Sequence, residues 1–323
     1  LRDRNRSACP TDGEYPMSSS FSRRDFLKTS AVAGAAGLYL NPGVVRASRS
    51  ANEKLNIAAV GTQNRAFANI KGCLDENIVA LCDIDSNMLG KAAQTLPDAR
   101  KYRDFRVMLE KEQDKIDAVL VGTPDHCHAP AAAMALRMKK HVYCEKPLTH
   151  TVKEARTLAN LAAENNLVTQ MGTQIHAGNN YRRVVELVRS GAIGKIDRVH
   201  VWVPAVYDQG QYAPAEKPAN VDWDLWLGPA PERPYSKNVH PFKWRNFWDY
   251  GTGGLGDFGC HYMDLVHWAL DLRGPLKVSA QGSPVSETSC PSWVIADYHY
   301  PSRGCDSPPV HLTWYDGGNS PEM

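Results

Sequence analysis

A short run of residues near position 61 has the spacing of a loop that binds a dinucleotide. The apolar run KLNIAAVG (54–61) ends at Gly61, and the next residues, T-Q-N-R-A, end at Ala66. In a G-x-G-x-x-G or G-x-G-x-x-A fingerprint, the first Gly permits a tight turn and the last small residue lets the helix pack on the strand. Gln63 departs from the fingerprint, whose middle Gly lets the backbone approach the pyrophosphate. Arg65 is a candidate phosphate contact, so the stretch predicts a dinucleotide site.

A carboxylate further along the chain strengthens this prediction. Asp83 lies near the end of a second apolar run, NIVALCDID (77–85), at roughly the 20-residue spacing expected after the first Gly. A carboxylate there accepts hydrogen bonds from the adenosine ribose hydroxyls and repels a 2′-phosphate. We therefore expect NAD rather than NADP, with Asp85 as an alternative for the ribose contact.

Two later apolar runs also end in residues that could meet a ligand. Thr123 and Pro124 end IDAVLVGTP (116–124), and CEKPLTH (144–150) lies at the end of the run that begins HVY. Open parallel sheets bind ligands at the carboxyl ends of their strands. Both groups of residues are therefore expected beside the dinucleotide.

A histidine and an aspartate near residue 260 could handle a proton. In GDFGCHYMD (256–264), Asp257 and His261 are four positions apart, which puts them on one face of a helix. An imidazole with an unperturbed pKa of about 6.5 can take the proton of a hydroxyl group near neutral pH. The pair is typical of acid–base chemistry.

Strands that alternate with helices must position these groups in the first half of the chain. The expected strands are 54–61, 77–85, 116–124, 141–147 and 167–173, and the expected helices are 65–75, 86–96, a segment ending at Lys115, 130–140 and 152–166. This alternation is typical of βαβ units in a doubly wound parallel sheet. We therefore interpret residues 53–172 as a dinucleotide-binding Rossmann domain of α/β class.

The pattern changes after residue 173. The expected elements are helices at 181–191 and around Asp257, strands at 194–204, 276–283, 293–300 and 310–315, and a stretch dense in Pro, Trp and Tyr at 205–250. This order indicates an α+β domain with an open, mostly antiparallel sheet. We interpret residues 173–323 as a domain for substrate binding and oligomerisation.

Three of these stretches together resemble one enzyme family. VGTPDHCH (121–128), CEKPLTH (144–150) and GDFGCHYMD (256–264) are similar to motifs of the glucose–fructose oxidoreductase, inositol dehydrogenase and MocA (Gfo/Idh/MocA) family. The resemblance spans residues 53–316. It implies that the substrate domain continues beyond residue 323, so that the chain is C-terminally incomplete, and that copies of the chain associate into homo-oligomers.

The resemblance also implies an activity and three catalytic residues. The family's catalytic positions match Lys146, Asp257 and His261, and the implied reaction is NAD(P)-dependent oxidation or reduction at a secondary alcohol of a sugar or polyol. On this interpretation His261 takes the hydroxyl proton while a hydride passes to nicotinamide C4. Asp257 orients the imidazole, and Lys146 stabilises the developing alkoxide.

The remaining candidates contact cofactor or substrate. The cofactor candidates are Gly61, Gln63, Arg65, Ala66, Asp83, Thr123, Pro124, His128, Glu145 and Lys146, and the substrate candidates are Gln174, His176, Trp244, Arg245 and His261. A Trp face can stack on a sugar and Arg can bind hydroxyls or carboxylates, but core packing explains a tryptophan equally well. For His128, a contact with the cofactor edge and a structural role on a loop both stay open. Because the adjacent residues of HCH (126–128) on a loop would not converge on one ion, no metal site is expected.

The N-terminal segment predicts export. RR at 23–24 followed by FLK (26–28) resembles the twin-arginine motif, and an apolar stretch rich in Ala and Gly leads to a small-residue cleavage site at 45–47. We interpret residues 1–47 as a disordered lead and a signal read by the twin-arginine translocase, with a periplasmic mature protein. This route carries folded proteins, and free NAD has no dependable pool outside the cytoplasm. We therefore expect a tightly bound cofactor.

Composition narrows the remaining function classes. The formal net charge of +2 gives no reason to expect a nucleic-acid partner. No apolar stretch after residue 47 approaches the ~20 residues that span a bilayer, so no membrane span is expected in the mature protein. Two alternatives stay open beside the oxidoreductase: an NAD-dependent glycoside hydrolase that acts through a transient keto-sugar, and a non-catalytic carbohydrate-binding relative.

Overall fold

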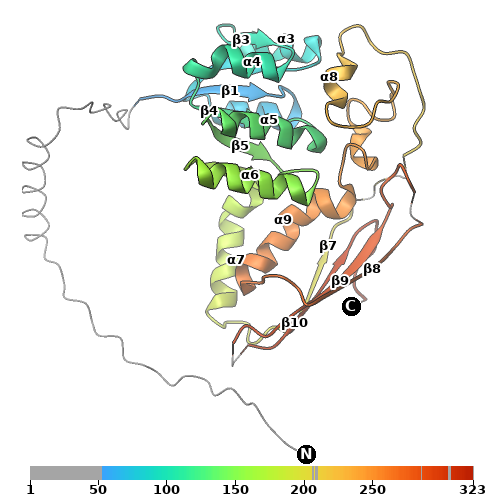
Figure 1. The fold of residues 1–323 in the computed structure, drawn as a ribbon. Helices are drawn as coiled ribbons and strands as arrows, with labels where there is room; N and C mark the ends of the chain where they lie inside the picture. Colours follow the sequence, from blue (N-terminus) through green and yellow to red (C-terminus); the bar gives the residue numbers. More distant parts are fainter. Residues whose placement is uncertain (1–52, 206, 208–209, 285, 305–306, 323) are drawn as a thin grey trace, which may run out of the picture. The chain divides into compact units, whose positions relative to one another are not determined.

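The computed structural model describes residues 53–205, 207, 210–284, 286–304 and 307–322. The predicted lead and twin-arginine segment, residues 1–47, lies outside the described residues. From Lys54 onward the chain builds two β-sheets with helices packed on them (Figure 1). No helix in these described ranges is both long and apolar enough to cross a membrane.

The first sheet is parallel throughout and has the strand order β3-β2-β1-β4-β5-β6. Its strands are β1 (Asn56–Val60), β2 (Asn77–Cys82), β3 (Arg100–Tyr102), β4 (Ala118–Val121), β5 (His141–Glu145) and β6 (Thr169–Gly172). This is the strand order of a doubly wound dinucleotide-binding fold, in which the direction of the order reverses between β1 and β4. The predicted Rossmann sheet is confirmed.

Helices cover both faces of this sheet. They are α2 (Asn64–Gly72), α3 (Ser86–Thr95), α4 (Phe105–Glu112), α5 (Asp125–Arg137) and α6 (Val152–Glu164), with a 3-10 turn at Gln113–Lys115. In β1, Ala58 and Val60 pack into one apolar core, and Ile57 and Ala59 pack into the core on the opposite face. Because alternate side chains of a strand point to opposite faces, a strand buried on both sides is apolar throughout its length.

Helix α5 begins at Asp125, earlier than the predicted residue 130. Pro124 is its N-cap, and Asp125 places an acidic side chain in the first turn, where acidic residues are common. The predicted helix begins at Pro130, and Pro is common at the first helical position, but the observed helix runs through this residue. His126 and His128 therefore lie on a helix and not on a loop.

The second sheet is mixed, with the strand order β7-β10-β9-β8. Its strands are β7 (Arg198–Trp202), β8 (Lys277–Gly282), β9 (Val294–Tyr300) and β10 (Val310–Tyr315). The β10–β7 pair is parallel, and the β10–β9 and β8–β9 pairs are antiparallel. The predicted α+β arrangement with a mostly antiparallel sheet is confirmed.

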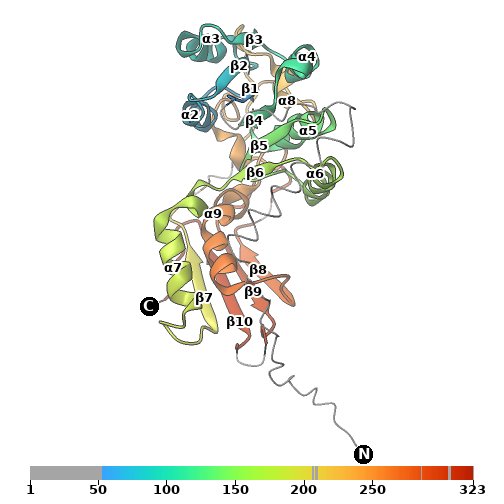
Figure 2. The ribbon, with the colours of Figure 1, turned by 90° about the vertical axis from the view of Figure 1, so that its left-hand side faces the viewer.

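Two helices pack side by side on one face of the second sheet (Figures 1 and 2). They are α7 (Asn179–Arg189) and α9 (Gly253–Leu270), and a 3-10 turn at Gln174–Ala177 leads into α7. Leu312 and Trp314 of β10 share an apolar core with Val266 and Leu270 of α9. This packing fixes the helix that carries Asp257 and His261.

Residues 210–250, which we call the aromatic segment, pack against the first sheet. The segment contains α8 (Trp223–Leu227) and a 3-10 turn at Lys243–Asn246. Its apolar core is formed by the buried side chains of Trp223, Trp226, Leu227, Tyr235, Val239, Trp244, Phe247 and Tyr250. The Asp222 N–H donates to the Ile84 carbonyl over 3.1 Å, and the Ser86 N–H donates to the Asn220 carbonyl over 3.0 Å. These bonds hold the segment at the carboxyl end of β2.

Candidate active site

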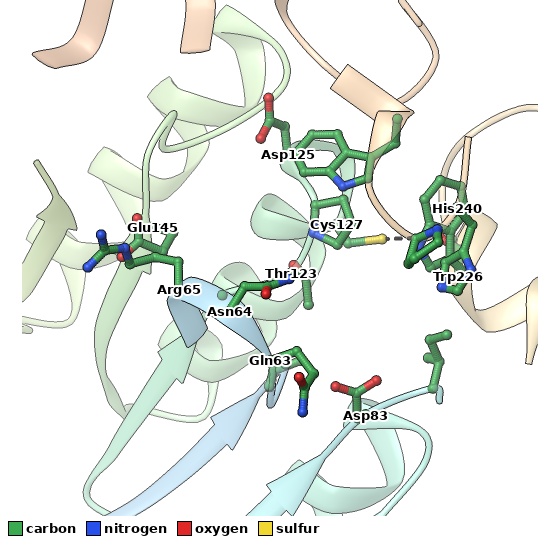
Figure 3. A pocket seen from close by; sticks show the side chains of 18 of the residues that line it. Gln63, Asn64, Arg65, Asp83, Thr123, Asp125, Cys127, Glu145, Trp226 and His240 are labelled. Atoms are coloured by element: carbon green, nitrogen blue, oxygen red, sulfur yellow. Dashed lines mark hydrogen bonds between the residues drawn. The ribbon is translucent and has the colours of Figure 1, made fainter. Parts of the chain in front are cut away.

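A cavity of about 1300 Å³ lies where the first sheet ends. Residues 60–65, residues that follow β2, β4 and β5, the aromatic segment and α9 line it. Figure 3 shows Arg65 beside Glu145 on one side of the cavity and Trp226 beside His240 on the other. Small-ligand pockets are typically ~300–1,000 Å³ in volume, so this cavity has room for a dinucleotide together with a substrate.

The loop after β1 has the backbone geometry that the fingerprint requires. Gly61 has φ +89°, and a Cβ on it would lie 2.8 Å from the Gly122 carbonyl oxygen. Gln63 has an extended backbone with φ −124°, so a side chain is accommodated there without strain. Ala66 is buried, and a Cβ on Gly122 would lie 2.6 Å from the Ala66 Cβ. Gly122 is thus a second glycine on which the loop depends, and the sequence prediction missed it although it lies in the quoted VGTP stretch.

Asp83 reaches the cavity at the end of β2, as Figure 3 shows. Its carboxylate accepts hydrogen bonds from the Thr62 N–H (2.9 Å), the Thr62 hydroxyl (2.7 Å) and the Asp85 N–H (3.0 Å). Burial raises the pKa of Asp83 despite these bonds. Asp85 also borders the cavity, but its carboxylate caps α3 and accepts from the Asn220 amide. Asp83 is therefore the better placed of the two for a ribose.

The side chains of Thr123, after β4, and Glu145, at the end of β5, differ in their hydrogen bonds to the rest of the protein. The Thr123 hydroxyl is buried and has no hydrogen-bond partner among the described residues. The Glu145 carboxylate accepts from the amides of Asn69 and Gln174, each over 2.7 Å. A Cβ on Gly172 would lie 2.7 Å from that carboxylate. Thr123 is free to meet a ligand, whereas Glu145 ties α2, β5 and the turn after β6 together.

Lys146 meets Asp257 at the junction of the two sheets. The ammonium group pairs with the Asp257 carboxylate and donates to the Asp257 carbonyl oxygen over 2.9 Å. The Arg245 guanidinium lies 3.2 Å from the second carboxylate oxygen, and the Tyr207 hydroxyl donates to the same oxygen. Burial alone would raise the pKa of Asp257, but the Arg245 and Lys146 charges hold it below its ordinary value. The carboxylate is therefore ionised and fully engaged.

His261 lines the cavity one helical turn after Asp257, but the two side chains are not hydrogen-bonded to each other in the described structure. The buried Nδ1 of His261 has no hydrogen-bond partner in the part of the chain that the structure describes. Burial lowers the pKa of His261, and the Lys146 charge lowers it further. The prediction that Asp257 orients this imidazole is corrected, because the Asp257 carboxylate pairs with Lys146 and Arg245 and accepts a hydrogen bond from Tyr207.

Asp125 is a second buried carboxyl group beside this cluster, and the sequence reading missed it. It is 2% exposed, lines the cavity and accepts a hydrogen bond from the Thr252 hydroxyl over 3.1 Å. Burial and the negative charge of Asp257 raise the pKa of Asp125 to about 7. Only its position directly after the Thr123-Pro124 strand end could have indicated it.

Three predicted site residues, Ala66, His128 and His176, are not among the residues that line the cavity. Ala66 is the buried residue that packs against Gly122. His128 is 1% exposed, and its ring nitrogens face the backbone carbonyls of Pro147 and Thr123. His176 pairs with Asp264 over 2.7 Å and stacks on Trp268 with a 4.2 Å ring separation. The predicted substrate contact of His176 is corrected, because its ring is already occupied by protein groups. Of the two roles left open for His128, its contacts agree with the structural one, on a helix and not on a loop.

The other predicted substrate residues border the cavity. Gln174 lines it while its amide donates to Glu145. Trp244 is buried in the core of the aromatic segment, and the Arg245 guanidinium carbon lies 4.0 Å from its ring centroid. Of the two roles weighed for Trp244, the structure shows the packing in the core, and the contact with a sugar stays a prediction.

The residues around the cavity fit NAD. Gly61 has no side chain that could block the approach of a ligand to the loop after β1. The Thr123 hydroxyl has no hydrogen-bond partner among the described residues, and the Asp83 carboxylate borders the cavity. Backbone exposed at the start of a helix suits a pyrophosphate, an unpaired hydroxyl suits an amide or ribose, and a carboxylate suits the ribose diol.

Two family models match most of the described chain. Residues 54–173 match "Oxidoreductase family, NAD-binding Rossmann fold", and residues 181–307 match "Oxidoreductase family, C-terminal alpha/beta domain". Residues 20–38 match the twin-arginine translocation pathway signal sequence. The predicted cofactor class and the predicted export route are confirmed.

Known proteins of two kinds are similar to this chain. A glycosyl hydrolase family 109 protein of Saccharopolyspora erythraea is 28% identical over 291 residues, which are 78% of this chain and 57% of that protein. A myo-inositol 2-dehydrogenase of Thermotoga maritima is 26% identical over 127 residues, which are 39% of this chain and 37% of that protein. The chain thus spans less than two thirds of the length of either relative.

A solved structure shows the same fold. The WlbA dehydrogenase of Bordetella pertussis, in complex with NADH and UDP-GlcNAcA, matches with a TM-score of 0.63 and 19% identity. The match covers 84% of this chain and 69% of that chain.

Proposed function

Because the chain belongs to the Gfo/Idh/MocA oxidoreductase family, we propose that it is an exported NAD-dependent oxidoreductase acting on a secondary alcohol of a sugar or polyol. One observation carries the proposal. A single cavity joins the dinucleotide end, at Gly61 and Asp83, to Lys146 and His261.

His261 is the proposed base for the hydroxyl proton. Its lowered pKa keeps the imidazole neutral near pH 7, so that it can accept a proton. Because Nδ1 is buried, Nε2 is the ring nitrogen open to a substrate in the cavity. Loss of a proton from the hydroxyl is the event that this residue assists.

Lys146 is the proposed stabiliser of the oxygen that becomes negative. Its ammonium group is held by the ionised Asp257 carboxylate, which is itself held by Arg245 and Tyr207. A fixed charge in a site that excludes water stabilises a developing alkoxide without costly reorganisation. Asp257 therefore serves to position the lysine.

Gly61, Asp83 and Thr123 would hold the cofactor, and the carboxyl end of the first sheet would direct it toward Lys146. When bound, NAD supplies the nicotinamide ring that exchanges a hydride with the substrate carbon.

We also propose that the cofactor is held tightly through export. The aromatic segment forms a cavity wall and is bonded to both ends of the turn after β2, which is where the adenosine ribose would lie. The twin-arginine route transports folded proteins, so a dinucleotide enclosed in this way would travel with the chain. A redox-neutral cycle would then regenerate it on the spot.

Glycoside hydrolysis is the second candidate. Its support is the similarity to a glycosyl hydrolase family 109 protein over 78% of this chain. Transient oxidation of a sugar carbon acidifies the adjacent C–H, so a glycosidic group can leave by elimination without the paired carboxylates of ordinary glycosidases. The overall reaction has no net change in oxidation state.

The test begins with the small molecule that the full chain carries. The exported protein is purified and denatured, and mass spectrometry of the extract is expected to find stoichiometric NAD. A panel of sugars, polyols and glycosides then separates a keto product or an alditol from a freed aglycone. Absence of bound dinucleotide, together with no binding of added NAD, would overturn the proposal, and Lys146→Met is the control with strongly reduced activity.

A further inference from the structure

The imidazole of His128 lies between two backbone carbonyls. Nδ1 is 2.7 Å from the Pro147 oxygen, and Nε2 is 2.7 Å from the Thr123 oxygen. The side chain is 1% exposed, so water is not available to either nitrogen. Both contacts have the distance of a charge-assisted hydrogen bond.

Carbonyl oxygens only accept hydrogen bonds. A neutral imidazole has one N–H and one lone pair, so either tautomer would leave a lone pair against a carbonyl lone pair. This conclusion does not depend on which tautomer is assigned, because the two partners are the same kind of group. Only the imidazolium, with a proton on each nitrogen, satisfies both contacts.

We propose that His128 is a buried imidazolium that fixes the turn carrying Lys146, and that it is therefore a positioning residue for the reaction. The carbonyl of Thr123 follows β4, and the carbonyl of Pro147 follows Lys146 at the end of β5. The charged ring thus ties together the carboxyl ends of two adjacent parallel strands. The positioning role rests on the proposed function, whereas the charge does not.

The ionisable groups around the ring come from three places. Cys144 on β5 interacts with the ring and favours its charged form, His126 lies on the same helix, and Lys146 lies beside Pro147. Burial alone lowers the pKa of His128, but Cys144 and the two carbonyls reverse that effect and leave it above its ordinary value. The His128 charge should therefore persist at pH values where exposed histidines are neutral, and disappear as the pH rises through the raised pKa.

His126 provides a matched contrast two residues earlier on the same helix. Its Nε2 lies 2.9 Å from the Trp226 carbonyl oxygen, while its buried Nδ1 has no hydrogen-bond partner among the described residues. One acceptor needs only one N–H, so a neutral ring fits. Burial lowers the pKa of His126 to about 4.

Nuclear magnetic resonance of the full chain with ¹⁵N-labelled histidine tests the charge directly. At pH 7, just above the ordinary pKa of histidine, the His128 ring is expected to carry protons on both nitrogens, and the His126 ring on one. Overhauser contacts to Pro147 assign the signal without any variant. A single protonated nitrogen at His128 at this pH would overturn the proposal.

The positioning role is tested with two substitutions. His128→Gln offers a donor to one carbonyl and places an oxygen against the other, whereas His128→Lys keeps a positive charge that can donate to both. We expect His128→Gln to retain NAD and KM but to lose about 10- to 100-fold in kcat, because small misplacements of a reacting group have costs of that size. His128→Lys should recover part of the loss, and His126→Gln should change stability without changing kcat.

The outcomes separate the two claims. Wild-type kcat in a folded His128→Gln variant would overturn the positioning role. A wild-type protein that turns over no sugar, polyol or glycoside would overturn the proposed function. The nuclear magnetic resonance measurement would still show whether the His128 ring is charged. In that case the positioning readout is the chemical shift of the Lys146 ammonium group, compared between wild type, His128→Lys and His128→Gln. A chemical shift that is the same in all three proteins would count against the role.

Discussion

The ammonium group of Lys146 pairs with the carboxylate of Asp257 and also donates to the Asp257 backbone carbonyl, 111 residues further along the chain. The lysine follows a strand of the parallel sheet, and the aspartate lies on the helix that packs on the mixed sheet. Their side chains are 14% and 7% exposed. One buried ion pair therefore links the nucleotide-binding sheet to the second sheet at the proposed reaction centre.

Removing one member of this pair should damage both stability and activity. In Lys146→Met, the partners that Asp257 keeps among the described residues are Arg245 and Tyr207. Removing one partner of a buried charge typically costs about 3–5 kcal/mol. We expect urea unfolding to show a loss of this order and kcat/KM to fall steeply. The double variant Lys146→Met/Asp257→Asn should regain stability but not activity. Equal stability of wild type and Lys146→Met would contradict the pairing.

The acid limb of the pH–rate profile should report His261. The base must be neutral, so activity is lost as the pH falls through the pKa of His261, which burial and Lys146 hold below its ordinary value of 6.5. The wild-type limb is expected below pH 6.5. Removal of the Lys146 charge should move the limb upward in the residual activity of Lys146→Met. A limb that survives in His261→Gln would assign it to another group.

Asp125 should make the protein less stable as the pH rises from 4 to 7. Its pKa is about 7 in the folded protein against an ordinary 3.8, so the folded state keeps a proton that the unfolded state releases in this range. A difference of about 3 pKa units corresponds to about 4 kcal/mol. Asp125→Asn, which cannot ionise, should gain stability over wild type across this range and reach a constant advantage above pH 7. Parallel stability curves for the two proteins would refute this explanation.

Gly122 should tolerate no side chain. A Cβ there would lie 2.6 Å from the Ala66 Cβ and 2.9 Å from the Ala66 Cα, so Gly122→Ala should push α2 away from β4. We expect a loss of about 1–3 kcal/mol and a lower content of bound NAD. Gly90→Ala is the matched control, because nothing lies within 4 Å of that position in α3. It should be neutral or gain about 0.5–1 kcal/mol, since Ala favours a helix over Gly.

Local patterns predicted most of the nucleotide-binding half. Strands buried on both faces are continuous apolar runs, which are easily recognised. The Gly61 turn and the Asp83 carboxylate lie within one βαβ unit, so their separation along the sequence is enough to predict that they meet at the same edge of the sheet. The start of α5 was predicted too late because Pro130 gave the local signal of a first turn. The aromatic segment has no helical or strand periodicity, and its place at the carboxyl end of β2 depends on backbone bonds to residues 84 and 86.

The amino-acid sequence alone determined the class of the protein, its cofactor, its export signal and the three residues proposed for catalysis. Only the tertiary structure decided which groups those residues meet. Helical spacing puts Asp257 and His261 on one face, but the aspartate pairs with Lys146, Arg245 and Tyr207, which reach it from other parts of the chain. Likewise, His128 is placed between two strand ends by the parallel register of β4 and β5. A buried charge takes its partners from whatever the packing of distant elements brings near, and that packing has no counterpart in the spacing of residues along the chain.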